Sequence, residues 1–454
     1  MLLPFAFSAP QVTASAQQLI DAEHGAGAAI GVVHDGQLIY VKTFGDRNIA
    51  QKEPVDADTR FEIGSVTKQF TAAAILQLQE QGKLSIDDRL AKYLPSFPHA
   101  GEITLRQLLN QVSGLPDYTN MPDIVTEMST VPDASAKIAG YVAAPLHFTP
   151  GTKWEYSNTN YWVLGQVVAT VSGVSWEDYV RTHLFAAAGM THSGFVSDEP
   201  VFEDFATPYW QGLKNDQPLQ PAPKMLESWP GGAGAIVSTI GDLAAWDNAL
   251  AGGKIVSHDD YVLMSTPARL ADGKLTDYGM GLEVAAHEGH NRIGHNGGTN
   301  GSLTVNGTYP DDKLDIIVLE NSLRGDPGAL ESAVLESIYP DALATARTPA
   351  KGEDLAVRKR IVNLINQLLS GTLPPAELSP AMQSVLTPER QKAAAAHFAS
   401  FGAPTAVIFK DRADDAGATW YLYRVEFAHN VENFQIQIDK KSGIVTGMSM
   451  RPAG

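Results

Sequence analysis

The sequence predicts an α+β protein with one large domain, whose sheet is closed by strands from both ends of that domain, and a second, smaller α+β domain. Three observations lead to this prediction. Strand-like apolar runs occur near residues 28–47 and again over 292–320, and the sequence between them has mostly helical spacing. After a Pro- and Ala-rich stretch at 340–353, helices are again followed by strands. Helices and strands that are segregated in this way are typical of the α+β class.

The first region is predicted to be a β-hairpin. Residues 28–33 and 38–41 are apolar, and His34-Asp35-Gly36 between them has the composition of a turn. A helix is expected from about Ser65 to Gln81, where apolar residues recur at helical spacing until Gly82 ends it. The further elements expected in this domain are helices at 104–112, 160–172, 175–187 and 239–251, and strands at 292–295, 302–309 and 314–320.

Four segments are predicted along the chain. Residues 1–16 are either the remnant of an export signal or an N-terminal arm, because an apolar run and Ala14-Ser15-Ala16 occur without the basic residues that open a signal peptide. The large domain covers 17–340, a linker covers 341–354, and the small α+β domain of unknown role covers 355–454. In the small domain we expect helices at about 355–370, 378–384 and 388–400, and strands at 404–410, 418–428, 432–439 and near 443–449.

The composition limits the classes of partner and chemistry. The 454 residues carry a formal net charge of −18 without a basic run, which argues against nucleic acid and anionic membrane surfaces as partners. The chain has no cysteine, so disulfides, thiolate metal sites and cysteine nucleophiles are excluded. The absence of an apolar run of about 18 residues predicts no transmembrane helix. We expect a periplasmic or secreted protein, with the cytoplasm as the alternative.

Three separate segments carry side chains suited to acyl transfer. Ser65 and Lys68 stand three residues apart at the start of a predicted helix, and residues at this spacing share a helix face with Cβ atoms about 5–6 Å apart. Lysine can activate a serine hydroxyl when burial or neighbouring charge lowers the lysine pKa. The second and third segments are Tyr156-Ser157-Asn158 and Gly294-His295-Asn296-Gly297-Gly298.

These three motifs, in this order, resemble the signature set of the class C beta-lactamase-like serine hydrolases, a family that includes penicillin-binding proteins, D-amino-acid peptidases and lactamase-fold esterases. The set is Ser-x-x-Lys, Tyr-x-Asn and a Lys/His-x-Gly element on a strand edge. The resemblance covers about residues 15–335 and implies a serine beta-lactamase-like fold, with an antiparallel sheet flanked by helices and a helical insert. The segments that support it lie at 61–64, 103–109, 113–116, 231–234 and 238–239.

The resemblance also implies roles for individual residues. Ser65 attacks a carbonyl group to form an acyl-enzyme, and either Lys68 or Tyr156 takes its proton. For Tyr156 this requires nearby cations that depress its pKa from about 10. The backbone N–H groups of Ser65 and Gly298 form the oxyanion hole. The residues expected to bind substrate are Asn158, His295, Asn296 and Gly297, and Asn158 is alternatively a partner of Lys68.

One departure from the family pattern bears on the substrate. His295 stands where the penicillin-recognising relatives have lysine, and a histidine near pH 7 is mostly neutral. The change argues against beta-lactams and carboxylate-ended peptides, and it favours esters, amides or peptides with less anionic ends. Tyr118 and Trp154 are candidates for pocket walls, with ordinary core packing as the alternative.

We therefore expect a serine hydrolase, either an esterase or a peptidase, that uses no metal or organic cofactor and acts on a small-molecule or peptide substrate. The alternatives are a beta-lactamase or penicillin-binding D,D-peptidase, and a non-catalytic ligand sensor. His287-Glu288-Gly289-His290 lacks the spacing of the zinc-binding His-Glu-x-x-His helix. The small domain caps the site, mediates self-association as a homo-oligomer, or does neither.

Overall fold

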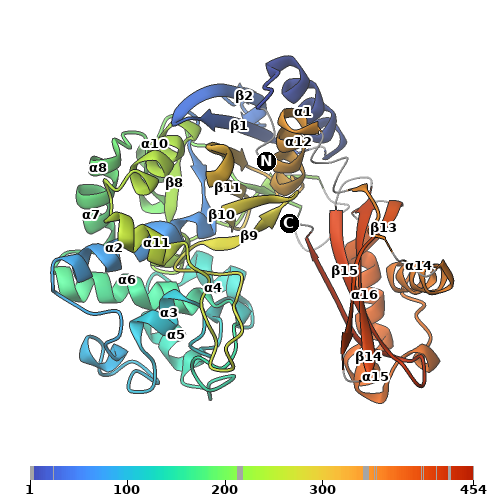
Figure 1. The fold of residues 1–454 in the computed structure, drawn as a ribbon. Coiled ribbons are helices and arrows are strands. Elements are labelled where there is room, and N and C mark those ends of the chain that lie inside the picture. Colours follow the sequence, from blue (N-terminus) through green and yellow to red (C-terminus); the bar gives the residue numbers. More distant parts are fainter. Residues whose placement is uncertain are drawn as a thin grey trace.

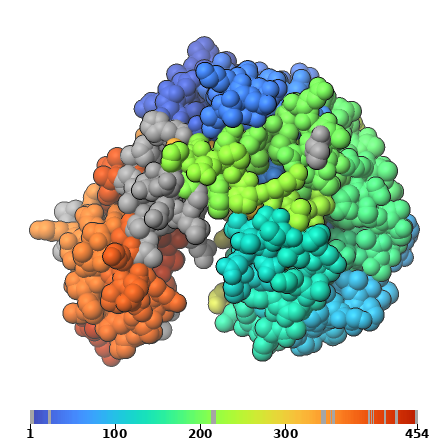
Figure 2. All heavy atoms as spheres, turned by 180° about the vertical axis from the view of Figure 1, so that it is seen from behind, coloured from blue at the N-terminus to red at the C-terminus, as the bar shows by residue number. Residues whose placement is uncertain are grey.

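Figure 1 shows two bodies, a large one around a broad sheet and a small one, in orange and red, of helices and strands. Seen from behind, the orange small body lies beside the large one (Figure 2). This arrangement confirms the predicted α+β class. None of the described helices is long and apolar enough to cross a membrane. The computed structural model describes residues 5–23, 25–211, 218–340, 347–351, 353, 355–399, 401, 403–415, 417–427 and 431–452.

The large sheet has seven strands in the order β3-β2-β1-β12-β11-β10-β9, and each strand runs antiparallel to its neighbours. The N-terminal strand β1 pairs directly with β12, so the two ends of the domain close one sheet, as predicted. Strand β9 lies at the edge. The strands are β1 (Gly27–His34), β2 (Gln37–Asn48), β3 (Glu53–Pro54), β9 (Glu283–His287), β10 (His290–Gly298), β11 (Leu303–Tyr309) and β12 (Leu314–Glu320).

Helix α2 (Thr67–Glu80) lies in the centre of the large body, and most of its residues are buried. Its buried polar side chains have hydrogen-bond partners within the protein, as Gln69 has in Asn306 and Thr71 has in the Gly232 oxygen. It contacts α6 (Asn158–Ser172) and α9 (Gly231–Gly234) of the helical insert. The predicted helix at 175–187 is divided into α7 (Trp176–Tyr179), a π-helical segment η4 (Val180–Phe185) and α8 (Ala186–Ala188).

The remaining elements of the large body are short. Its helices are α3 (Leu105–Leu109), α4 (Ile124–Thr130), α5 (Ser135–Val142), α10 (Ile240–Ala251) and α11 (His258–Met264). Its minor strands are β4 (Phe61–Glu62), β5 (Gly194–Phe195), β6 (Tyr209–Trp210), β7 (Gln220–Pro221) and β8 (Ile236–Ser238). Strands β4, β8 and β5 form a small sheet that leads into the segment before α2.

Two helices that the sequence analysis did not predict, α1 (Ala9–Glu23) and α12 (Pro327–Ile338), pack against each other and against the large sheet. Val12 and Ala16 of α1 are buried in the same apolar cluster as residues of β1, β11 and β12. Cleavage after Ala16 would remove the first half of this packed helix. Both alternatives for residues 1–16, the remnant of an export signal and an N-terminal arm, stay predictions.

The small body contains the predicted helices and the predicted antiparallel meander, in the strand order β13-β14-β15-β16. Its own apolar core includes Ile361, Leu364, Phe409 and Phe434. The predicted domain boundaries stay a prediction, and most of the predicted linker lies outside the described residues. The elements are α14 (Leu355–Leu369), α15 (Pro380–Val385), α16 (Pro388–Ala399), β13 (Pro404–Asp415), β14 (Ala418–Phe427), β15 (Val431–Asp439) and β16 (Val445–Pro452).

The turn between β9 and β10 contacts the small sheet through a buried ion pair. Glu288 of this turn faces Arg424 of β14, with Nη1 and Oε2 2.9 Å apart and Nη2 donating to Oε1 at 3.1 Å. Both side chains are almost fully buried. Arg424 Nε also donates to Glu426 at 3.0 Å. The small sheet thereby holds the hairpin that carries the third sequence motif.

Candidate active site

The predicted nucleophile and its two predicted partners lie together. Helix α2 begins at Thr67, two residues later than expected, and Ser65 lies in the 3₁₀ turn η1 (Gly64–Val66) before it. Lys68, in the first turn of α2, has its Nζ 2.9 Å from Ser65 Oγ. Tyr156, just before α6, donates its hydroxyl to the same oxygen at 2.7 Å. Ser65 Oγ is therefore contacted by the two groups that the sequence analysis proposed as its proton acceptors.

Lys68 is fully buried, and its amine has two further partners. Nζ donates to Asn158 Oδ1 at 2.8 Å and to the backbone oxygen of Ala233 at 2.9 Å. A neutral amine has two N–H donors and one lone pair. Because the two carbonyl oxygens can only accept, they take both donors of the neutral form, and the lone pair is left facing the Ser65 hydroxyl. This geometry suits removal of the serine proton by Lys68.

The electrostatics of the two candidate bases differ. Burial lowers the pKa of Lys68 to about 7, an effect that the negative charges of Asp117 and Glu283 partly oppose. Burial instead raises the pKa of Tyr156 well above its usual value, and the same two carboxylates add to the increase. The depression of the Tyr156 pKa that a base role requires is thus not found. Lys68 has the pKa of a base near neutral pH, and Tyr156 is a neutral hydrogen-bond donor.

Asn158 links Lys68 to a carboxylate that the sequence analysis missed. Its Nδ2 donates to Asp117 Oδ2 at 3.1 Å, while its Oδ1 accepts from Lys68. Asp117 directly follows segment 113–116, which supports the family resemblance. No local sequence pattern predicts that it contacts Asn158. Asn158 therefore holds Lys68 in place, which is one of its two predicted roles.

Strand β10 lies directly against the turn that carries Ser65. A Cβ atom on Gly64, whose φ is +49°, would come within 2.7 Å of the Gly298 nitrogen. A Cβ atom on Gly297 would come within 2.0 Å of the Ile63 oxygen. Only glycine permits such an approach of two backbones. The glycines thus bring the Gly298 N–H and the Ser65 turn together, as the predicted oxyanion hole requires.

His295 lies beside Tyr156, with the two ring centroids 6.1 Å apart, but its ring nitrogens bond other residues. Its Nδ1 is 2.6 Å from the Asn296 carbonyl oxygen, which can only accept, so Nδ1 carries the proton and Nε2 accepts from Tyr278 at 3.0 Å. Burial, together with the charge of Lys68, lowers the pKa of His295 to about 3. The ring is neutral, as expected, but both nitrogens are occupied and only 2% of the residue is exposed. In this structure His295 supports Tyr278 and has no free nitrogen for a substrate.

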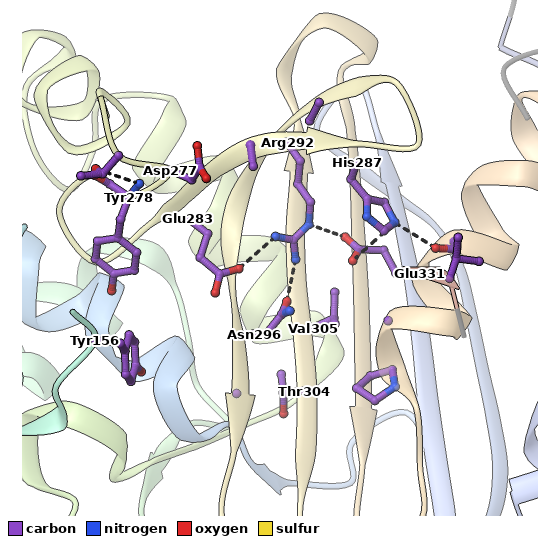
Figure 3. Close-up of a pocket in the computed structure, with 18 of the residues that line it drawn as sticks. Tyr156, Asp277, Tyr278, Glu283, His287, Arg292, Asn296, Thr304, Val305 and Glu331 are labelled. Carbon is purple, nitrogen blue, oxygen red and sulfur yellow. Dashed lines mark hydrogen bonds and ion pairs between the residues drawn. The ribbon is translucent and has the colours of Figure 1, made fainter. Parts of the chain in front are cut away.

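A cavity of about 1360 Å³ begins at Tyr156 and follows the β9–β10 edge. Trp154 and Tyr278 line it at the Tyr156 end, whereas Tyr118 is a core residue whose hydroxyl bonds the Trp229 oxygen at 2.6 Å. The predicted residues Asn296 and Gly297 line its floor, and Figure 3 shows Asn296 beside Arg292. Its far end is lined by α12 and by residues at the β14 and β15 ends of the small sheet.

The histidines of the β9–β10 hairpin have separate partners. His287 Nε2 is 3.0 Å from the Ser332 hydroxyl, and His290 Nδ1 is 2.7 Å from Asp312. Among the described residues, no group of three or more His, Asp or Glu side chains is arranged to hold a metal ion.

Comparison with known proteins identifies the family. The beta-lactamase family profile matches residues 12–337, so the chain belongs to this family. It is 35% identical to the putative penicillin-binding protein PbpX of Bacillus subtilis over 58% of this chain and 63% of that protein. It is 29% identical to a D-aminopeptidase of Brucella abortus over 65% of this chain and 56% of that enzyme. The chain thus spans less than two thirds of both relatives.

A solved structure resembles nearly the whole chain. The octameric penicillin-binding protein homologue from Pyrococcus abyssi covers 98% of this chain and is itself covered completely, with a TM-score of 0.65 at 22% identity. This likeness shows a shared fold. Together with the family match, it confirms the predicted beta-lactamase-like fold and the prediction of a serine-hydrolase family.

Proposed function

We propose that this chain hydrolyses amides, short peptides or esters through an acyl-enzyme on Ser65. The observation that carries the proposal is the contact of Ser65 Oγ with both Lys68 Nζ and the Tyr156 hydroxyl, at 2.9 and 2.7 Å, with burial holding the Lys68 pKa near 7. The name of the Brucella relative, D-aminopeptidase, supports amides and peptides as substrates.

The geometry supports a simple sequence of steps. Neutral Lys68 takes the Ser65 proton while Oγ forms a bond to the substrate carbonyl carbon, and the N–H groups of Ser65 and Gly298 bind the resulting oxyanion. Collapse of this intermediate breaks the bond to the leaving amine or alcohol, which receives the proton held by Lys68. Water then attacks the acyl carbon while Lys68 takes its proton. The bond between this carbon and Ser65 Oγ breaks, the acid is released, and Lys68 returns the proton to Oγ. Tyr156 donates to Ser65 Oγ in the free enzyme and retains its own proton.

The site also bears on the choice between amides and beta-lactams. The motif position that is lysine in penicillin-recognising relatives holds a buried, neutral histidine here, so this position offers no cation for a substrate carboxylate. We therefore expect weak recognition of beta-lactams and of carboxylate-ended peptides.

A substrate panel tests the proposal. The wild type and Ser65→Ala are compared on p-nitrophenyl esters, on aminoacyl p-nitroanilides of both configurations and on nitrocefin. We expect turnover of esters or anilides that exceeds nitrocefin turnover and is lost in the variant. Full activity of Ser65→Ala would overturn the assignment of the nucleophile. A stable covalent adduct without turnover of any substrate would support the sensor alternative.

A further inference from the structure

Glu283 places a carboxylate in the cavity that begins at Tyr156. It is the first residue of the edge strand β9, opposite Gly294 of β10, and it lines the cavity together with Tyr156 and Asn296. Figure 3 shows its carboxylate turned from the strand toward the space beside these two residues. Its charge affects the pKa of both Lys68 and Tyr156. Glu283 is therefore close to the reacting atoms, although it takes no part in the proposed steps of acylation and hydrolysis.

The negative charge of Glu283 is only partly compensated. Arg292 Nε donates to Glu331 at 2.7 Å, whereas its Nη1 reaches Glu283 at the longer distance of 3.4 Å. Its Nη2 donates to Asn296 at 2.8 Å. Burial lowers the pKa of the neighbouring His287, which keeps that ring neutral. One guanidinium thus serves two carboxylates, and the better contact belongs to Glu331.

The other cations that line the cavity do not supply the missing charge. Lys274 pairs with Asp272 at 2.8 Å, and Lys153 is exposed on the segment before Tyr156. The charge of Lys68 also lowers the pKa of Glu283, but only while Lys68 is protonated. Burial raises the pKa of Glu283, while 36% of its side chain stays exposed and can be reached by a ligand. A cation brought by a ligand would supply both the charge and the hydrogen-bond donors that this carboxylate lacks.

We infer that Glu283 binds an ammonium group of the substrate, so that this site prefers amides, peptides or esters that carry a free amine near the scissile carbonyl group. The inference rests on the proposed hydrolase function and names its substrate class. The ammonium group lies beside Glu283 and Asn296 while the carbonyl carbon faces Ser65. An acylated amine has no charge and loses this interaction.

The test compares paired substrates, an aminoacyl p-nitroanilide with a free amine and its N-acetyl derivative. For the wild type we expect a higher kcat/KM on the free amine. In Glu283→Gln the ratio of the two values should fall about 10- to 100-fold, the effect of losing one hydrogen bond to a charged group. The near-isosteric Glu336→Gln, at the far end of the same cavity, is the matched control and should keep the wild-type ratio.

Three outcomes separate the hypotheses. An unchanged ratio in Glu283→Gln, whether both activities fall together or neither falls, overturns the inference and leaves the hydrolase proposal standing. Activity that survives in Ser65→Ala overturns the hydrolase proposal itself. Inhibition by a simple amine tests the same contact in a variant that is shown to be folded. We expect 2-phenylethylamine to inhibit the wild type competitively, with an inhibition constant about 10-fold lower than for Glu283→Gln. Equal inhibition of the two would also overturn the inference.

Discussion

The pH dependence of acylation should move when Asp117 is changed to asparagine. Two hydrogen bonds in series, of 2.8 and 3.1 Å, join Lys68 Nζ to Asp117 through the amide of Asn158. They place the ammonium and carboxylate groups within about 8 Å of each other. At an effective dielectric constant of about 20, the attraction between two unit charges at this distance is about 2 kcal/mol, which corresponds to about 1.5 pKa units. The carboxylate raises the pKa of Lys68, so its removal should lower that pKa.

The magnitude matters because Lys68 acts in its neutral form. With a pKa of about 7, half of the enzyme holds neutral Lys68 at pH 7, whereas at the ordinary value of 10.5 only about one molecule in 3000 would do so. The acid limb of kcat/KM should therefore lie near pH 7 in the wild type, with activity rising as the pH rises. In Asp117→Asn the limb should move down by about 1 to 1.5 units.

The assay is the kcat/KM of an uncharged p-nitrophenyl ester between pH 4.5 and 9. Asparagine keeps an acceptor for the Asn158 amide, so the chain of hydrogen bonds can persist. Asp411→Asn, an exposed carboxylate of β13 that is far along the sequence from all three motifs, serves as the control and should leave the limb in place. A limb that stays near pH 7 in Asp117→Asn, or that moves upward, would refute Lys68 as the titrating base.

Two further predictions concern a partner of the nucleophile and the contact between the two sheets. Tyr156→Phe removes the hydroxyl that donates to Ser65 Oγ at 2.7 Å. The kcat/KM should fall by about 10²–10³, while the acid limb of its pH profile stays near pH 7. Loss of that limb would mean that Tyr156 is the base. Arg424→Met leaves Glu288 buried without its cation and should destabilise the protein by about 3–5 kcal/mol in denaturant unfolding. The double variant Glu288→Gln/Arg424→Met should recover part of this loss, and a single variant as stable as the wild type would show that the pair contributes nothing.

The parts of the site that are local in sequence were the most predictable. Ser65 and Lys68 share one helix start, so their spacing alone placed the amine near the hydroxyl. The placement of Tyr156 and of the Gly297-Gly298 edge was predicted from the family resemblance, because no local pattern brings these segments to α2. Asp117 and Glu283 were missed for the same reason, since each reaches the site only through tertiary packing.

His295 shows how a strand limits what a motif can present. Successive side chains of a strand point to opposite faces, so His295 and Asn296 of β10 cannot both face one cavity. The structure turns Asn296 toward Arg292 and His295 toward Tyr278. The sequence predicts that neighbouring side chains of β10 point to opposite faces of the sheet. Which side chain points to which face depends on how β10 packs in the folded protein.

Among the helices that were not predicted, α12 and α1 have different explanations. Before α12, Asp326 accepts from the Ala329 N–H and Pro327 opens the helix, which is a recognisable start signal that the sequence analysis did not use. Helix α1 is rich in Ala and Gln, and it packs against β2 of the sheet and against α12. The helices and strands of the small body were easier to predict, because the helices come first in its sequence and the strands of the meander follow them in order.

The central claim, a covalent intermediate on Ser65, is tested most directly by mass spectrometry of the protein after reaction with a fluorophosphonate. We predict one adduct per chain, located by peptide mapping on the segment that contains Ser65, and none in Ser65→Ala. The reaction of the wild type should accelerate as the pH rises through 7, because neutral Lys68 removes the serine proton. An adduct on another residue, or an unmodified Ser65 in an enzyme that loses its activity to the reagent, would contradict the account.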